Sequence, residues 1–407
     1  MRRSTWLLFF LVLLLAIVIY EPYEPGSTQS PESNTEGTIA LSGNNETPLV
    51  VWYVVAKRLG PDFMEKASAF RPDILLLTVY AEDDIAPYPL VNRSFDLAGL
   101  VDGLHGLGVK VFFSFSLFSR SSLPREEYDR LLYEEGIPYP EQTIHMADYA
   151  RHLRETNETL YHETYDIYLE NGLDPEKIPH VERKPVDGYL IPPGQYTSID
   201  PLYQPYHEFM VRMMEQIIAI AEPDGLAFDH VRFFTFDDGY NQDCRDWMFN
   251  ASGLDIYEHT PRPMFHITEW SGDDALYYDT RAQLISHAVS DIIDRPQFDG
   301  YEKFGTSMGM TEPARSNGQY AELQGQLYDA VLLMAYDDDS NEVARNVRET
   351  NEASGADIIL GVPGFIGEEA VMRNIDAGLA AGARGIYLLG YTFSDDVHDY
   401  LLELRGA

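Results

Sequence analysis

Eight short apolar runs, rich in β-branched and aromatic residues, recur along the chain after residue 47 and most constrain its fold. Continuous runs of this kind are typical of parallel strands buried on both faces. Amphipathic segments with helical spacing lie between most of them, for example residues 205–221 and 273–293. Eight alternating strand and helix units predict an α/β fold, the closed (β/α)8 TIM barrel. The runs comprise residues 48–56, 73–81, 109–118, 224–233, 302–310, 329–338, 357–365 and 384–393.

One connection is much longer than a helix and two turns require. Residues 119–223 separate the third and fourth expected strands and are rich in Tyr, His and Pro. From its place in the chain we expect this insertion to lie over the mouth that the C-terminal ends of the strands form. Aromatic side chains there suit stacking against sugar rings, but they could equally form the core of a covering subdomain.

The N-terminus predicts entry into the export pathway. Arg2 and Arg3 precede an uncharged, mainly apolar run from Thr5 to Tyr20, so residues 1–20 fit a signal anchor or a signal peptide. No clear cleavage site follows, and we expect retention as a membrane anchor, with the basic residues cytoplasmic and the barrel outside. Residues 21–47 are rich in Pro, Ser, Thr, Glu and Gly, which predicts a disordered stalk before a barrel at 48–407.

The charge balance excludes some partners. The chain has 66 acidic and 29 basic residues and a net charge of -37, which makes nucleic acid and anionic membrane surfaces poor partners. Concentrated salt would screen the self-repulsion of so acidic a surface. The single cysteine, Cys244, excludes an internal disulfide. No phosphate-binding glycine loop is present, and we expect no cofactor.

Polar residues cluster where the expected strands end. Because a barrel of this type places its chemistry at the C-terminal ends of its strands, these residues are candidates for a site. On an ideal strand, side chains alternate between faces, so His230 is expected to point away from Asp229. The residues are Glu82 after the second strand, Asp229, His230 and Arg232 in the fourth, and Tyr336 and Asp337 in the sixth.

Several segments resemble one family of bacterial proteins. "SIDPLYQPYHEFMVRMMEQIIAIAEPDGLAFDHVRF" is similar to the part of the glycosyl-hydrolase-like 10 family in which an Asp-Pro turn leads a helix into an Asp-Gly-x-His-x-Asp-x-x-Arg strand. "FDLAGLVDGLHGLGVKVFFSF", "EKFGTSMGM" and "YDAVLLMAYDDD" resemble its third, fifth and sixth strand units, so the likeness covers about residues 48–393 without much of the insertion. The resemblance implies a glycoside hydrolase barrel that acts on an extracellular or cell-envelope polysaccharide.

This chain departs from the family pattern in places. Ala227 stands where the family often has His, and Phe233 and Phe234 replace its usual Tyr-Pro. The sixth strand also resembles that of family 18 chitinases, but Val231 occupies the position of their catalytic Glu. The resemblance therefore does not imply substrate-assisted chitinase chemistry.

Glycoside hydrolysis needs two carboxyl groups beside the scissile bond. We expect Asp229 to be the nucleophile or base, with Arg232 turning back to keep it ionised; the alternative is a structural Asp-Arg pair. For the general acid we favour Asp337, whose partial burial would favour its protonated form, over Glu269 and then Asp238. The remaining candidates for sugar contacts are Tyr336, Trp270, Tyr391, Glu82 and His230.

Two other functions stay open from the sequence. A barrel that has lost its activity could bind glycans or envelope partners without cleaving them, and the departures named above favour this reading. A metal-dependent esterase or deacetylase could use Asp and His, but no His-x-x-x-His pair is present. The run from Asp337 to Asp339 lacks the spaced pattern of a Ca²⁺ loop, so we assign no metal ligand.

Overall fold

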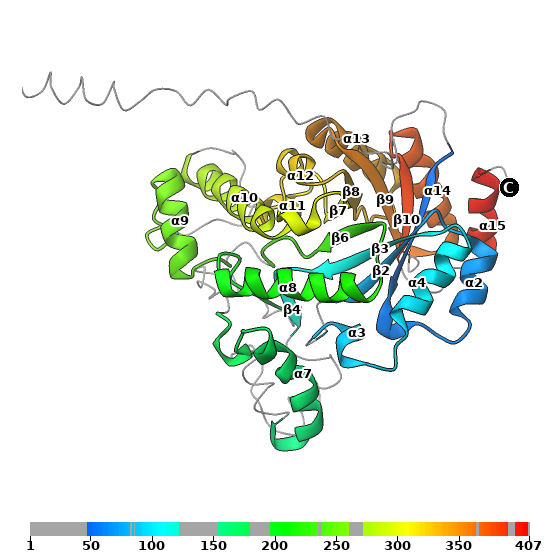
Figure 1. Ribbon diagram of the computed structural model, residues 1–407. Coiled ribbons are helices and arrows are strands. Elements are labelled where there is room, and N and C mark those ends of the chain that lie inside the picture. Colours follow the sequence, from blue (N-terminus) through cyan, green and yellow to red (C-terminus); the bar gives the residue numbers. More distant parts are fainter. Residues whose placement is uncertain are drawn as a thin grey trace, which may run out of the picture. The chain divides into compact units, whose positions relative to one another are not determined.

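The computed structural model describes residues 47–81, 84, 86–121, 154–179, 196–234, 238–259, 272–363, 366–389 and 395–405. Within these residues, eight parallel strands form a closed barrel in the order β1-β10-β9-β8-β7-β6-β3-β2 (Figure 1). The predicted (β/α)8 fold is confirmed, and each of the eight expected runs contains one barrel strand. The strands are β1 Leu49–Val55, β2 Ile74–Tyr80, β3 Lys110–Ser116, β6 Gly225–Asp229, β7 Glu302–Ser307, β8 Ala330–Leu333, β9 Asp357–Pro363 and β10 Gly385–Leu389.

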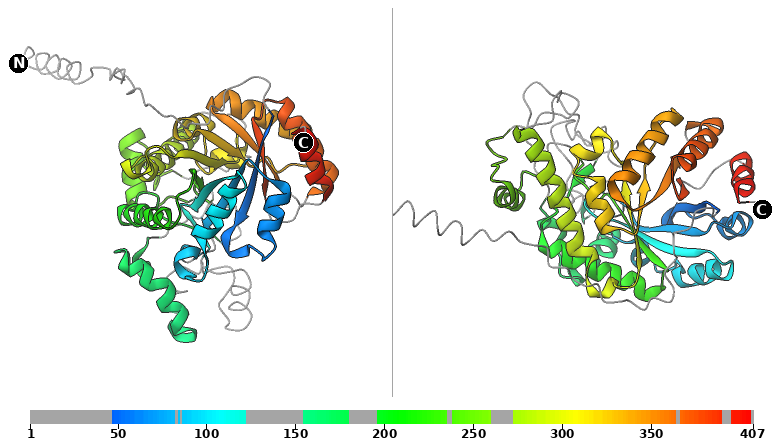
Figure 2. Two further views of the ribbon diagram at one scale, coloured as in Figure 1. Left: turned by 45° about the vertical axis from the view of Figure 1, so that its right-hand side comes forward. Right: turned by 90° about the horizontal axis from the view of Figure 1, so that it is seen from above.

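Helices follow the strands and surround the barrel, as two further views show (Figure 2). The expected helices at 205–221 and 273–293 are present as α8 and α10. The described helices of this layer are η1 Ala56–Arg58, α2 Phe63–Phe70, α3 Tyr88–Val91, α4 Leu97–Gly106, α8 Gln204–Ile220, α9 Gln242–Ser252, α10 Gly272–Ile293, η4 Pro296–Phe298, α11 Glu312–Ser316, α12 Ala321–Leu327, α13 Ser340–Ser354, α14 Glu368–Ala380 and α15 Asp395–Leu404.

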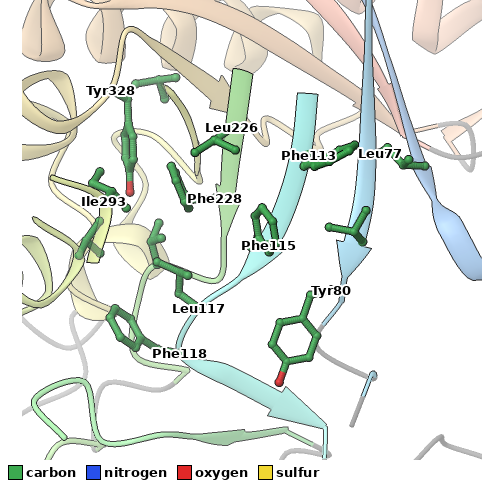
Figure 3. Packing of buried hydrophobic residues seen from close by; sticks show 14 of the residues in the cluster. Leu77, Tyr80, Phe113, Phe115, Leu117, Phe118, Leu226, Phe228, Ile293 and Tyr328 are labelled. Atoms are coloured by element: carbon green, nitrogen blue, oxygen red, sulfur yellow. The ribbon is translucent and has the colours of Figure 1, made fainter. Parts of the chain in front are cut away.

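The strands are apolar on both faces because each face packs against a different layer. One face fills the lumen, where the rings of Phe112 and Phe304 lie 4.7 Å apart. The other face packs against the helices, where Phe228 stacks on Tyr328 with ring centroids 6.3 Å apart (Figure 3). Full burial of each such side chain contributes about 1.5–3 kcal/mol, so the two layers together form the main stabilising core.

The N-terminal ends of the strands are tied together by aspartates. In "RPDILL", "EPDGLA" and "LYDAVL", the Asp stands immediately before a strand, and its carboxylate accepts a backbone N–H from the neighbouring strand. These bonds occupy donors that would otherwise be unpaired at the end of the ladder. The donors and acceptors are Val50 and Asp73, Val111 and Asp224, and Lys303 and Asp329, at 2.8, 2.7 and 2.8 Å. These three aspartates at the N-terminal end of the barrel therefore have a structural role.

The described part of the insertion packs against the opposite end of the barrel. It contains β4 Ser119–Ser121, α7 Glu158–Glu170, η2 Pro175–Lys177 and β5 Tyr196–Ser198, with β4 and β5 paired antiparallel. Tyr168 of α7 stacks on Phe209 at 4.4 Å, and its hydroxyl lies 2.6 Å from that of Tyr80 at the end of β2. Figure 3 shows Tyr80 at the end of β2 as one of the buried residues of the core cluster. Coverage of the whole mouth by residues 119–223 stays a prediction.

The expected anchor, residues 1–20, and the expected stalk, residues 21–47, lie outside the described residues except for residue 47. Among the residues that are described, no helix is both long enough and apolar enough to cross a membrane.

The first prediction concerns Glu302, which faces the lumen at the N-terminal end of β7. Burial, helped by repulsion from Asp329 and Asp357, raises the pKa of Glu302 to about 7. The folded protein therefore holds a proton that the unfolded chain releases, and this stability is lost as the pH rises through about 7. We expect Glu302→Gln to be more stable than the parent at pH 8, by about 1–2 kcal/mol after allowance for partial exposure, and to lose this advantage at pH 4.

Denaturant unfolding at both pH values measures the difference. Glu322→Gln, at an exposed position of α12, is the matched control and should change stability equally little at both. An identical effect of the two substitutions at pH 8 would contradict the role given to Glu302.

Candidate active site

Asp229 is the last residue of β6 and faces the lumen at its C-terminal end. The alternation along the strand places Ala227 in the lumen and Phe228 against the helices, so Asp229 returns to the lumen side. Its carbonyl accepts the N–H of Leu117 at 2.9 Å, which fixes the backbone against the end of β3. The side chain is 16% exposed, so the carboxylate reaches the mouth while remaining largely desolvated.

The hydrogen bonds to the Asp229 carboxylate converge on one oxygen. The Thr306 hydroxyl donates to Oδ1 at 2.6 Å, and the His230 backbone N–H donates to the same atom at 2.7 Å. Oδ2 accepts no hydrogen bond from the residues that the structure describes. One oxygen thus holds the group in position, while the other keeps its hydrogen-bonding capacity within this part of the chain.

His230 lies on the same side as Asp229, so the expectation that it points to the opposite face is wrong. Its φ of 52° is in the left-handed region, which breaks the alternation of the strand. As a result, Nδ1 lies 3.6 Å from Asp229 Oδ1 and 3.1 Å from the Ser116 hydroxyl oxygen. Ser116 and Asp229 therefore both lie near Nδ1 of His230. In a Ser-His-Asp catalytic triad, by contrast, the Ser and the Asp bond to different nitrogens of the His ring.

The surroundings of Asp229 favour its ionised form. Burial alone would raise the pKa of Asp229, but attraction to His230, the bond from Thr306, the His230 N–H and attraction to Arg232 together lower it below its ordinary value. Arg232 makes the smallest of these contributions, and its guanidinium lies 5.5 Å from the ring centre of Phe234. Arg232 thus helps to keep Asp229 ionised, as expected, but the alternative of a direct Asp-Arg pair is wrong: the described ion pair and hydrogen bonds of Asp229 involve His230 and Thr306.

Two tyrosine hydroxyls lie within electrostatic range of this carboxylate. Tyr336, after β8, and Tyr387, in the lumen on β10, have hydroxyl oxygens 3.1 Å apart. Desolvation raises the pKa of Tyr387, and the charges of Tyr336 and Asp229 raise it further, which places all three groups within electrostatic reach. Gly361 of β9 makes room, because a Cβ there would lie 2.5 Å from the Tyr387 hydroxyl. Both hydroxyls are therefore kept protonated and can donate hydrogen bonds.

Asp337 is more exposed than the sequence predicted, so the expectation of partial burial is wrong. Its carboxylate accepts the N–H of Asp339 at 2.8 Å, and Asp339 in turn caps α13 by accepting the N–H of Asn341 at 2.9 Å. This loop turns the acidic run outward after β8. Asp337 nevertheless lines a cavity of about 500 Å³ together with Tyr336 and Arg232.

Asp238, a further candidate for the general acid, is buried and forms hydrogen bonds with other residues of the protein. It is 1% exposed, and its Oδ2 accepts hydrogen bonds from the Ser198 hydroxyl at 2.8 Å and from the Phe234 N–H at 3.1 Å. Buried Arg281 donates to the Asp238 carbonyl and lies 4.0 Å from the ring centre of Phe233. Asp238 therefore shapes the loop after β6.

Four of the expected site residues lie outside the described residues: Glu82, Glu269, Trp270 and Tyr391. Their roles stay predictions, as do the catalytic roles of the described candidates. Among the described residues, no group of three or more His, Cys, Asp and Glu side chains is arranged to hold a metal ion.

The sequence interpretation missed three residues of this site. Ser116 is the last residue of "KVFFSFS" and Thr306 the last but one of "EKFGTS", and each shares the lumen face with Phe112 or Phe304 of its own strand. Tyr387 occupies the middle of "GIYLL", within an apolar run. Counting positions in steps of two from each lumen residue would have singled out the two hydroxyl residues at the mouth.

No family model matches this chain, and no curated protein matches it. Among solved structures, the glycoside hydrolase domain of PgaB (BpsB) from Bordetella bronchiseptica is similar, with a TM-score of 0.53 and 15% identity over 88% of this chain and 98% of that one. The catalytic domain of the Paenibacillus polymyxa β-amylase has a TM-score of 0.46, 11% identity and coverages of 88% and 94%. The Geobacillus stearothermophilus GH36 α-galactosidase AgaA has a TM-score of 0.46, 10% identity and coverages of 88% and 41%.

The barrel is thus similar to the TIM-barrel domains of glycoside hydrolases. At 15% identity, the likeness to the PgaB domain shows the fold alone.

The hydrogen bond from Thr306 should stabilise the ionised form of Asp229, and a substitution tests this. Thr306→Val removes a hydroxyl that bonds the ionised carboxylate, so the pKa of Asp229 should rise. Because a lowered folded-state pKa gives stability that is lost as the pH falls through it, the variant should be less stable than the parent by about 1 kcal/mol at pH 7. The difference should shrink as the pH falls through the pKa of Asp229.

Chemical unfolding between pH 7 and pH 3 measures this difference. Thr78→Val is the matched control, because Thr78 is equally buried in the lumen on β2 and does not bond Asp229. A pH-independent loss in Thr306→Val would show that its hydroxyl does not stabilise the charged form.

Proposed function

We propose that the chain is a glycoside hydrolase that cleaves an extracellular or cell-envelope polysaccharide outside the cytoplasmic membrane. The observation that carries this proposal is Asp229, a largely desolvated, ionised carboxylate at the C-terminal end of a barrel strand whose described hydrogen bonds all go to one oxygen. A group of this kind can attack an anomeric carbon, activate water or stabilise developing positive charge. The finer assignment to the glycosyl-hydrolase-like 10 family rests on the sequence segments.

The neighbouring groups suit the other roles. Tyr336 is 36% exposed at the mouth and can donate a hydrogen bond to a sugar oxygen. The hydroxyl of Tyr387 is hydrogen-bonded to that of Tyr336 and helps to orient it. The second carboxyl group has to protonate the leaving oxygen, and Asp337 is the candidate because it lines the same cavity as Tyr336. Asp229 and Asp337 would then act as base or nucleophile and as acid.

The environment of Asp229 favours a catalytic role over glycan binding without cleavage. Keeping a carboxylate ionised in a desolvated position costs free energy that a binding surface has no need to spend. Here several donors and charges are arranged to offset that cost at one oxygen, a pattern found where a charged group has to react. We therefore rank the non-catalytic barrel second.

The third prediction concerns the reaction itself. Asp229→Asn keeps the size of the side chain and removes its charge, so we expect glycan turnover to fall by about a thousandfold or more with little loss of glycan binding. Screening the purified full chain on a glycan panel identifies a responsive substrate, on which the variant is then compared. Asp337→Asn should also reduce turnover, whereas Asp338→Asn, at the next and equally exposed position, should not.

Thermal melts on the same preparations separate a catalytic role from a structural one. If Asp229→Asn lowers the melting temperature while each folded molecule turns over glycan at the parental rate, Asp229 is structural. The proposed mechanism would then be wrong.

The fourth prediction concerns location. Arg2, Arg3 and the apolar run from Thr5 to Tyr20 support an anchor with the barrel outside the membrane. Protease added to intact cells that make the chain should digest the barrel, while a cytoplasmic marker stays protected. Full protection of the barrel in intact cells, with digestion after lysis, would overturn the proposed location.

A further inference from the structure

A cavity of about 500 Å³ lies between the C-terminal ends of β7 and β8 and helix α13. Arg232 and Tyr336 line it on the side of Asp229, so it adjoins the candidate active site. Its volume is within the range of about 300–1,000 Å³ that is usual for small-molecule sites. Most of the residues that line this cavity have no part in the proposed two-carboxylate reaction.

Three methionines converge on the cavity. Met308 and Met310 come from the turn after β7, and Met334 follows β8 directly. Methionine side chains are flexible and polarisable and fit apolar groups of irregular shape, but a thioether is only a weak hydrogen-bond acceptor. These side chains therefore suit an apolar substituent better than the hydroxyl groups of an unmodified sugar.

The turn that carries two of these methionines is held in place by α13. Asn346 accepts the N–H of Met310 at 2.9 Å and donates to the carbonyl of Met308 at 3.3 Å. Gly309 between them has a φ of 69°, and a Cβ there would lie 2.3 Å from the Asn346 side-chain oxygen. The wall of the cavity is thus formed before any ligand binds.

Charged side chains around the cavity do not favour an anion. Arg345 pairs with Glu342 on α13. The other charged groups that line the cavity are Arg232, Asp337 and Glu349, so two carboxylates face one guanidinium. An anionic substituent would meet net repulsion, whereas an uncharged group with a carbonyl could accept a hydrogen bond from Arg232.

We propose that this cavity is a subsite for a short, uncharged acyl group, such as acetyl, carried on a sugar residue of the glycan through an amide or an ester. The methionines contact the alkyl part, and the polar side toward Arg232 takes the carbonyl. The position of the sugar beside Asp229 rests on the proposed hydrolase function. The subsite selects acylated glycans over the same glycans without acyl groups.

Ligand-observed saturation-transfer NMR on the full chain in detergent tests the subsite. The probes are N-acetylglucosamine paired with glucosamine, and 6-O-acetylglucose paired with glucose. We expect the acylated sugar of at least one pair to bind about tenfold more tightly than its partner, as burial of one or two carbon groups predicts, with the strongest transfer to its methyl protons. The pair that shows the preference identifies the amide or the ester linkage.

Met308→Gln and Met310→Gln should abolish this preference, whereas Met64→Gln, at a half-buried position of α2 in the helix layer, should leave it unchanged. Equal binding within both pairs, absence of binding by all four sugars, or a preference that survives both substitutions would overturn the subsite. The hydrolase proposal is tested separately, because Asp229→Asn should keep the preference. A preference without hydrolysis of any glycan would contradict only the hydrolase, and hydrolysis without a preference only the subsite.

Discussion

The alternation of side chains along eight parallel strands is the constraint on which the rest of the structure depends. Every second side chain enters the lumen, and closure of the barrel leaves space there for only a few layers. Phe112, Phe304 and Leu332 fill the interior below the mouth. The same alternation then brings Thr306 and Asp229 to the lumen side at the C-terminal ends of their strands, where they bond each other. The packing of the core and the placement of the site thus follow from one geometric rule.

A desolvated carboxylate at that level needs groups that stabilise its charge, and they come from one neighbouring strand and one distorted residue. Thr306 comes from β7, while His230 contributes both its N–H and its ring because its backbone turns into the left-handed region. For a side chain with a Cβ, that conformation costs about 1 kcal/mol or more, so it persists only where the surroundings enforce it. Here the carbonyl of His230 accepts the N–H of Phe118, which anchors the strained residue to the chain leaving β3.

Much of the fold could be predicted from the sequence, because the apolar runs are long and regular enough to mark all eight strands. The position of Asp229 near a strand end could also be predicted, since polar residues begin to interrupt the fourth run at this point. The orientation of His230 could not, because strand alternation fails at a residue with positive φ and no glycine signals the turn. The exposure of Asp337 could not be predicted for a related reason: it follows the end of β8, so a loop hydrogen bond and not the pleat determines where its side chain points.

Acidic residues are so abundant in this chain that their number cannot mark a site, but their position relative to a strand can. An Asp immediately before a strand, such as Asp224, meets unpaired N–H groups at the N-terminal end of the barrel and bonds the neighbouring strand. An Asp at the start of a helix, such as Asp339, meets the free N–H groups of the first turn. An Asp that ends a strand meets neither set of donors. It stays ionised only if side chains such as Thr306 are placed for it, and that arrangement distinguishes Asp229 from the structural carboxylates.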